Sequence, residues 1–133
     1  MGTGIFPSTK KARLSGAAAE QLALEFLQSK GLEFVAKNFR TRRGEIDLIM
    51  LDNGVMVFVE VRFRSSVNFG SAEESITAQK CRRLTAAAQA YMQYEGLTEK
   101  VSARFDAVAI SPDKPQGQST SGYCINWIQN ILQ

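Results

Sequence analysis

Carboxylates occur at alternating positions in an otherwise apolar stretch near the middle of the chain. Glu45 and Asp47 lie in the apolar run before Asn53-Gly54, and Glu60 and Arg62 lie in the run after it. Carboxylate oxygens are the ligands that hard divalent cations such as Mg²⁺ and Mn²⁺ prefer. If the two runs bring Asp47 and Glu60 together, a cation between them would replace repulsion by attraction. The pattern therefore suggests metal-assisted chemistry.

The stretch itself is predicted to be a β-hairpin. Asn53-Gly54 between two apolar runs is a strong signal for a two-residue type I′ turn. In that register Asp47 lies opposite Glu60, and Glu45 lies opposite Arg62, all on one face, with opposed Cβ atoms about 5 Å apart. Two interpretations stay open here. Either a metal lies between Asp47 and Glu60, or Glu45 pairs with Arg62 while the other acids face solvent.

The spacing of apolar and turn-forming residues predicts one α/β domain over residues 15–133, after a mobile basic tail over residues 1–14. Helices are expected over 16–30, before the hairpin, and over 78–94, after it, because Ser15 and Thr77 are good N-caps. Further strands are expected over 32–39, 101–110 and 123–128. With the hairpin they form a mixed sheet of about four to five strands.

The 133-residue chain has no histidine, which narrows the chemistry further. Ser-His-Asp and Cys-His nucleophiles and His-based zinc sites are excluded, so catalysis would use carboxylates, lysine, arginine, tyrosine or a hard metal. Cys81 and Cys124 fit free thiols in a reducing cytoplasm. No apolar run has the length of a membrane span, and the first residues lack the apolar core of a signal peptide. We therefore expect a cytoplasmic protein without a membrane partner.

Basic residues gather next to the hairpin. Lys37, Arg40, Arg42 and Arg43 lie in the segment that leads into it, with no acid among them, and Arg64 follows its second strand. Such a cluster either forms a solvated loop or contacts the phosphates of a nucleic acid. Its position beside the acidic strand favours phosphate contact, and these five residues are our predicted nucleic-acid-binding set.

The hairpin sequence resembles a known family. The pattern G-E-I-D-L-I, a short turn and V-F-V-E-V-R is similar to that of the YraN-like family of uncharacterised bacterial proteins, and the similarity extends over most of the chain. A shorter and more degenerate motif resembles the PD-(D/E)xK nuclease superfamily, in particular the archaeal Holliday-junction resolvases. The resemblance implies a restriction-endonuclease-like core and metal-dependent hydrolysis of DNA, including branched DNA. It also implies a homodimer, because a junction has two symmetric cleavage points.

The resemblance also assigns roles to individual residues. In the superfamily an Asp and a Glu from neighbouring strands hold the metal, and a Lys follows shortly after the Glu. Asp47 and Glu60 match the metal positions and imply a Mg²⁺ or Mn²⁺ cofactor, but the Lys position is Arg62. A guanidinium can balance charge and donate to a phosphate oxygen, yet it stays protonated and cannot act as a base. Lys80 is the candidate amine, unless its methylene groups merely cover packed surface.

The first predicted helix offers two carboxylates. Glu20 shares a side with Leu24 and Leu27, whereas Glu25 projects toward the polar side. A solvated Glu is the more frequent situation, but resolvase-like nucleases carry a metal-site Glu on their first helix, and the resemblance gives that position to Glu20. The predicted catalytic set is thus Glu20, Asp47, Glu60, Arg62 and Lys80, with Glu20, Asp47 and Glu60 as metal ligands.

Three functions are consistent with these residues. The first is a structure-selective DNA nuclease, and the second is a nucleic-acid-binding protein on the same fold whose catalysis is weak or lost because of Arg62. The third is an interaction protein whose carboxylates merely pair with arginines. The roles of Glu45 and Asp106 stay open, since Asp106 could support the site or pair within the sheet near Arg104.

Overall fold

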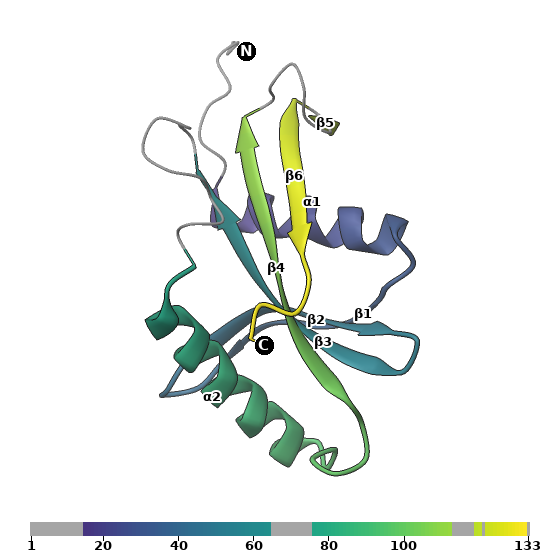
Figure 1. The fold of residues 1–133 in the computed structure, drawn as a ribbon, viewed down its shortest axis with the longest axis vertical. Coiled ribbons are helices and arrows are strands. Elements are labelled where there is room, and N and C mark those ends of the chain that lie inside the picture. The colour runs from purple at the N-terminus through teal and green to yellow at the C-terminus, as the bar shows by residue number, and fades with distance from the viewer. Residues whose placement is uncertain (1–14, 65–75, 113–118, 121, 133) are drawn as a thin grey trace, which may run out of the picture.

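A mixed β-sheet carries one helix on each face (Figure 1). The computed structural model describes residues 15–64, 76–112, 119–120 and 122–132. The strand order is β1-β2-β3-β4-β6-β5, in which β3 and β4 are parallel and the other neighbours are antiparallel. The elements are α1 (Gly16–Ser29), β1 (Glu33–Arg40), β2 (Glu45–Asp52), β3 (Val55–Phe63), α2 (Ala78–Tyr94), β4 (Ala103–Pro112), β5 (Ser119–Thr120) and β6 (Tyr123–Ile128).

This arrangement confirms the predicted α/β class, with one helix before the hairpin and one after it. The sheet has six strands rather than the predicted four to five, because the two-residue strand β5 joins its edge. β4 begins at Ala103 and ends at Pro112, two residues later at each end than predicted. The predicted tail over residues 1–14 lies outside the described residues. Within the described part of the chain, no helix is long and apolar enough to cross a membrane.

The hairpin between β2 and β3 has the predicted turn but a shorter ladder. Asn53 and Gly54 both have positive φ (51° and 87°), as a type I′ turn requires. Strand pairing runs in the predicted register from the turn to Leu48 and Val59, and it stops there. β2 nevertheless stays paired with β1 as far as its first residue, Glu45. The two strands of the hairpin therefore separate just before they reach Asp47 and Glu60.

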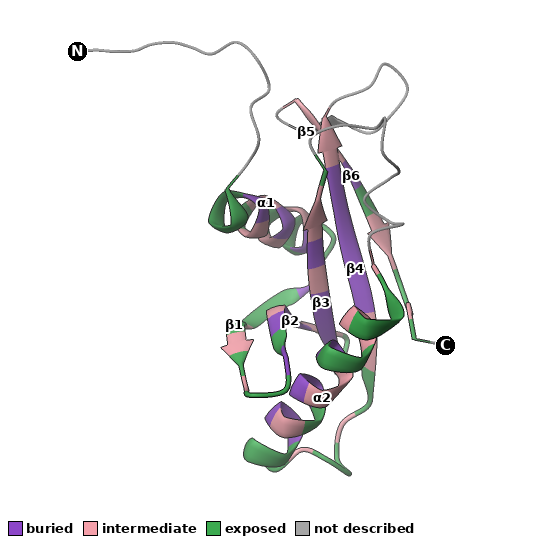
Figure 2. Cartoon of the chain, turned by 90° about the vertical axis from the view of Figure 1, so that its left-hand side faces the viewer, coloured by how far each residue is buried: buried purple, intermediate pink, exposed green. Residues whose placement is uncertain are grey.

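The apolar core consists of two clusters, one under each helix. Side chains alternate along β3, so that Val57 and Val59 belong to the cluster under α1, and Met56 and Phe58 belong to the cluster under α2. The buried helix residues are Ala19, Ala23 and Leu27 of α1 and Leu84, Ala87, Ala88, Tyr91 and Met92 of α2. Much of β3 and β4 is buried on both faces (Figure 2), which explains their nearly continuous apolar sequences.

Asp106 of β4 is completely buried, and its carboxylate is fully bonded. Arg104 Nε lies 3.1 Å from both of its oxygens, Trp127 Nε1 donates to Oδ2 at 3.0 Å, and the Asn130 backbone N–H donates to Oδ1 at 3.0 Å. Arg104 Nη1 also lies 3.0 Å from Asp52 at the hairpin turn. Asp106 therefore ties the C-terminal segment to the sheet. This contact decides the question that the sequence left open, in favour of a structural role.

Candidate metal and nucleic-acid site

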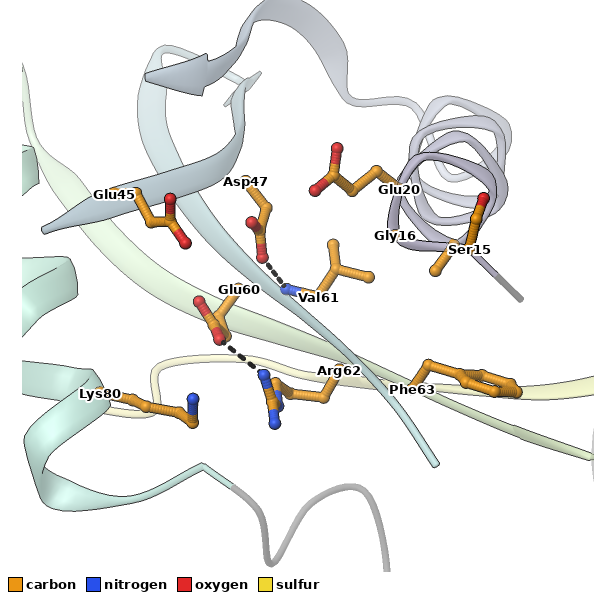
Figure 3. A pocket seen from close by; sticks show the side chains of 11 residues that line it. Ser15, Gly16, Glu20, Glu45, Asp47, Glu60, Val61, Arg62, Phe63 and Lys80 are labelled. Atoms are coloured by element: carbon orange, nitrogen blue, oxygen red, sulfur yellow. Dashed lines mark hydrogen bonds and ion pairs between the residues drawn. The ribbon is translucent and has the colours of Figure 1, made fainter. Parts of the chain in front are cut away.

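A pocket of about 240 Å³ lies where β2 and β3 separate. Its polar side chains come from both helices and both strands, and Figure 3 shows the carboxylates of Glu20, Glu45, Asp47 and Glu60 around one space. The full lining is Ser15, Gly16, Ala19, Glu20, Glu45, Asp47, Glu60, Val61, Arg62, Phe63 and Lys80. All five residues of the predicted catalytic set thus line the same pocket.

Asp47 is held in the pocket by the backbone of the neighbouring strand. Its Oδ2 accepts a hydrogen bond of 2.8 Å from the Val61 N–H, beyond the last backbone-paired residues of the hairpin. Burial raises the pKa of Asp47 to about 7, and the negative charges of Glu60, Glu20 and Glu45 add to this rise against the opposing effect of the Val61 bond. The charged groups that shift this pKa are therefore all carboxylates. A cation in the pocket would relieve that repulsion.

Glu60 is partly compensated. Its Oε2 lies 3.6 Å from Arg62 Nη1. Burial raises the pKa of Glu60, while the positive charges of Arg62, Lys80 and, more weakly, Arg83 act in the opposite direction. The positive charges of the site thus favour the ionised form of Glu60. The charged groups that shift the pKa of Asp47, by contrast, are all carboxylates and disfavour its ionised form.

The two helices both begin at this pocket. Ser15 caps α1 by accepting from the Ala18 N–H at 3.0 Å, and Thr77 caps α2 by accepting from the Lys80 N–H at 3.2 Å. The second turn of α1 brings Glu20 to one side of the pocket, and the first turn of α2 brings Lys80 to the other. Glu25 is exposed and accepts a hydrogen bond from the Gln21 side chain instead. The choice of Glu20 over Glu25 therefore agrees with the geometry.

The donor set fits a hard cation, although the carboxylates are not drawn together into a closed shell. Within residues 15–64, 76–112, 119–120 and 122–132, no three acidic or cysteine side chains already have the spacing that holds a metal ion. Like charges keep apart when no cation lies between them. Oxygen ligands alone line the acidic side of the pocket, and Mg²⁺ binds through one or two carboxylates with water in its other positions. Asp47, Glu60 and Glu20 are the side chains that would hold it.

The predicted nucleic-acid-binding residues lie outside the pocket. Lys37 and Arg40 are on β1, Arg42 and Arg43 are at the tip of the turn between β1 and β2, and Arg64 follows β3. All five side chains are exposed. Arg40 Nε lies 3.4 Å from Glu45 Oε1, which connects this basic segment to the edge of the acidic pocket.

Some features of the site could not be found from the sequence. Glu45 lines the pocket, as its place on the acidic face of the hairpin suggested, but no role followed from that place. Ser15, Gly16 and Ala19 line it because α1 starts there, and nothing in their residue types indicates a site. The contact of Gly44 with α2 is likewise a tertiary feature. A Cβ atom at Gly44 would come within 2.7 Å of the carbonyl carbon of Arg83.

Comparison with known proteins identifies the family. The profile described as "Uncharacterised protein family UPF0102" matches residues 19–110, a span that contains every residue of the predicted catalytic set. The chain belongs to this family. A UPF0102 protein of Pseudomonas putida KT2440 is 42% identical over 119 residues, covering 90% of this chain and 92% of its own length. A UPF0102 protein of Coxiella burnetii RSA 331 is 42% identical over 129 residues, covering 97% and 98%. The YraN-like resemblance predicted from the hairpin motif is thereby confirmed.

Proposed function

We propose that this UPF0102 protein is a metal-dependent nuclease that hydrolyses phosphodiester bonds of DNA. The observation that carries the proposal is the convergence of four carboxylates from α1, β2 and β3 on one pocket, where the half-buried Asp47 has other acids as its charged neighbours. A fold seldom buries like charges together, because each loses hydration and each repels the other. A divalent cation would make the arrangement stable, and a phosphate would complete it.

The side chains of the pocket divide the work. Asp47 is positioned by the Val61 N–H, so its carboxylate faces the pocket before any ligand arrives. Glu60 and Glu20 supply oxygens from the neighbouring strand and from α1. Mg²⁺ held by these three groups would neutralise charge on the scissile phosphate and lower the pKa of water. Glu45, which lies near Arg40, would add a further negative charge to the lining of the pocket.

Two basic groups are available for the phosphate. Arg62 lies on the strand of Glu60 and can donate to a phosphate oxygen, but it remains protonated at working pH. Lys80 reaches the same pocket from α2, and an amine, unlike a guanidinium, has the chemistry to position water or to act as a base. We therefore assign charge balance to Arg62 and the positioning or deprotonation of water to Lys80.

The decisive experiment measures Mg²⁺-dependent cleavage of four-way junctions, flaps and linear duplexes by the purified chain. Asp47→Asn should abolish cleavage, because it removes the charge and keeps an acceptor for the Val61 N–H. Glu25→Gln is the matched control, since it removes an exposed carboxylate of α1 and should leave the rate unchanged. Cleavage that survives in Asp47→Asn would come from another nuclease and would refute the proposal. Preference among the three substrates also tests the predicted action on branched DNA.

A second candidate is a nucleic-acid-binding protein with feeble or no catalysis. The contact between Arg62 and Glu60 favours it, because a guanidinium already paired with a metal ligand competes with the cation. Arg62→Lys distinguishes the two functions. A rise in cleavage would mean that arginine limits an active site, whereas DNA binding without cleavage in both forms would support the binding protein. The homodimer follows only from the resolvase-like resemblance, and sedimentation of the chain with and without a junction tests it.

A further inference from the structure

We propose that Arg82 and Arg83 of α2 join Arg42 and Arg43 of the neighbouring turn in one phosphate-binding surface, which holds the DNA backbone beside the acidic pocket. This surface, the four-arginine surface, rests on the proposed function for the identity of its ligand. Arg82 and Arg83 are not among the residues that the sequence assigned to nucleic acid. The tertiary structure brings them in.

Gly44 is the contact that joins the two segments. It is buried, and a Cβ atom at this position would overlap the backbone of Arg83. The turn is closed on itself, since the Thr41 N–H donates to the Gly44 carbonyl at 2.8 Å and the Gly44 N–H donates to Thr41 Oγ1 at 3.2 Å. Arg42 and Arg43 therefore project from a fixed turn that packs directly on the start of α2.

Within the described residues, the positive charges of this surface form no ion pairs with carboxylates. Arg42, Arg43, Arg82 and Arg83 are all exposed, and no salt bridge joins any of them to an acidic side chain within the described part of the chain. By contrast, Arg40 and Arg104 each lie within 4 Å of a carboxylate. Phosphate groups carry the opposite charge, so these four guanidinium groups would attract a nucleic-acid backbone.

The first turn of α2 contains no acidic residue and carries Lys80. The helix dipole is positive at that end, which favours bound phosphate and disfavours lysine, but this effect fades within the first turn. Arg82 and Arg83 lie in the second turn, so their attraction for phosphate depends on their own charges rather than on the dipole.

The surface adjoins the pocket, and this proximity indicates a polymer. Lys80 lines the pocket, and the charge of Arg83, three residues later, acts on Glu60 within it. A single phosphate would occupy either the pocket or the arginines. A phosphodiester backbone presents charges at regular intervals and can occupy both, with the scissile group at the acids and its neighbours at the arginines.

The test uses DNA binding without hydrolysis. The Asp47→Asn protein in EDTA is titrated with a labelled linear duplex, and the affinity is measured by fluorescence anisotropy over a series of KCl concentrations. Because each phosphate contact contributes about 0.9 to the slope of log K against log salt, Arg82→Gln/Arg83→Gln should lower that slope by about 1.8. Arg42→Gln/Arg43→Gln should have an effect of the same size.

The matched control removes the same net charge elsewhere. Lys30 follows α1 and lies over the Phe26 ring, and Lys100 follows α2, so both are exposed and distant from the start of α2. Lys30→Gln/Lys100→Gln should leave the slope almost unchanged. An equal loss in this control, or an unchanged slope in either arginine pair, would overturn the proposal. Because metal and cleavage are absent from the assay, a failure of the nuclease proposal would not alter this result.

Discussion

Two aspartates in the same sheet have opposite surroundings. Asp106 is completely buried, and Arg104, Trp127 and Asn130 all donate to its carboxylate. Asp47 is half-buried, accepts a hydrogen bond from the Val61 backbone, and has acids as the charged neighbours that shift its pKa. The comparison separates a carboxylate whose charge the fold balances from one whose charge the fold leaves unbalanced, as the proposed metal site requires. A buried acid indicates a site only when the protein leaves its charge unbalanced.

The largest expected difference between the two aspartates is in cleavage. Asp47→Asn should lower the rate of Mg²⁺-dependent hydrolysis by roughly 1000-fold or more, because transition-state charge is no longer stabilised. Asp106→Asn should leave the rate per folded molecule close to that of the original protein. Both rates are measured on the same duplex after correction for the folded fraction. A comparable loss in both variants would remove the distinction between them.

The next largest effect is on folding stability, where the substitution of Asp106 should matter more than that of Asp47. Asp106→Ala should lower the free energy of unfolding by about 3 kcal/mol, because it leaves Arg104 Nε, Trp127 Nε1 and the Asn130 N–H without their acceptor, although Arg104 keeps its contact with Asp52. Asp47→Ala removes a strained charge together with one acceptor, so its effect should be much smaller. Urea denaturation followed by circular dichroism gives both values. Equal destabilisation would show that Asp47 has a structural role like that of Asp106.

Stabilisation of the folded protein by a divalent cation should require the carboxylate of Asp47. Binding to the folded state alone adds about 2.7 kcal/mol when the free ion is at 100 times its dissociation constant. We expect Mn²⁺ to raise the Tm of the original chain and of Asp106→Asn, and to leave the Tm of Asp47→Asn unchanged. A Mn²⁺ shift that persists in Asp47→Asn would place the ion elsewhere.

The smallest predicted effect is a pH dependence of the metal-free protein. The pKa of Asp47 is raised from 3.8 to about 7, so the folded state holds this proton more tightly than the unfolded state. Its contribution to stability is then greatest below pH 4, falls as the pH rises toward 7, and is constant above that. In EDTA at pH 8, Asp47→Asn should be more stable than the original chain by on the order of 2 kcal/mol.

The difference between the two proteins should become small near pH 4, where Asp47 is protonated in the folded state and partly protonated in the unfolded state. Thermal unfolding in EDTA at pH 4, 6 and 8 measures it. Asp106→Asn is the control that should be destabilised throughout this range, since its carboxylate is balanced by Arg104. An Asp47→Asn protein that is less stable at pH 8 than the original would mean that its charge is compensated in the fold.

The sequence was sufficient for the fold class and for five of the residues that line the pocket, for different reasons. Asn53-Gly54 encodes its turn locally, and the turn fixes the register that brings Asp47 and Glu60 to one end of the hairpin. The placement of Glu20 needed the family resemblance, because helix periodicity alone cannot distinguish a pocket from solvent. Lys80 was predicted for its place after the hairpin, and the geometry agrees.

What the sequence could not show depends on contacts between distant residues. The ladder between β2 and β3 ends at Leu48 and Val59, and beyond that point the Val61 N–H donates to the side chain of Asp47. The packing of Gly44 on Arg83 has no local signal, since the glycine has an ordinary negative φ. The bonds of Asp106 reach residues at the far end of the chain, so its structural role became visible only in three dimensions.

The gap in the hairpin also limits how this protein can change over evolutionary time. Backbone pairing between β2 and β3 and the pocket between them cannot occupy the same segments of the two strands. Each further pair of backbone hydrogen bonds beyond Leu48 and Val59 would break the bond between Asp47 and Val61 and close the pocket. A homologue with a longer β2–β3 hairpin would thereby lose the pocket that the proposed function needs, although its sequence would keep every acidic residue of the motif.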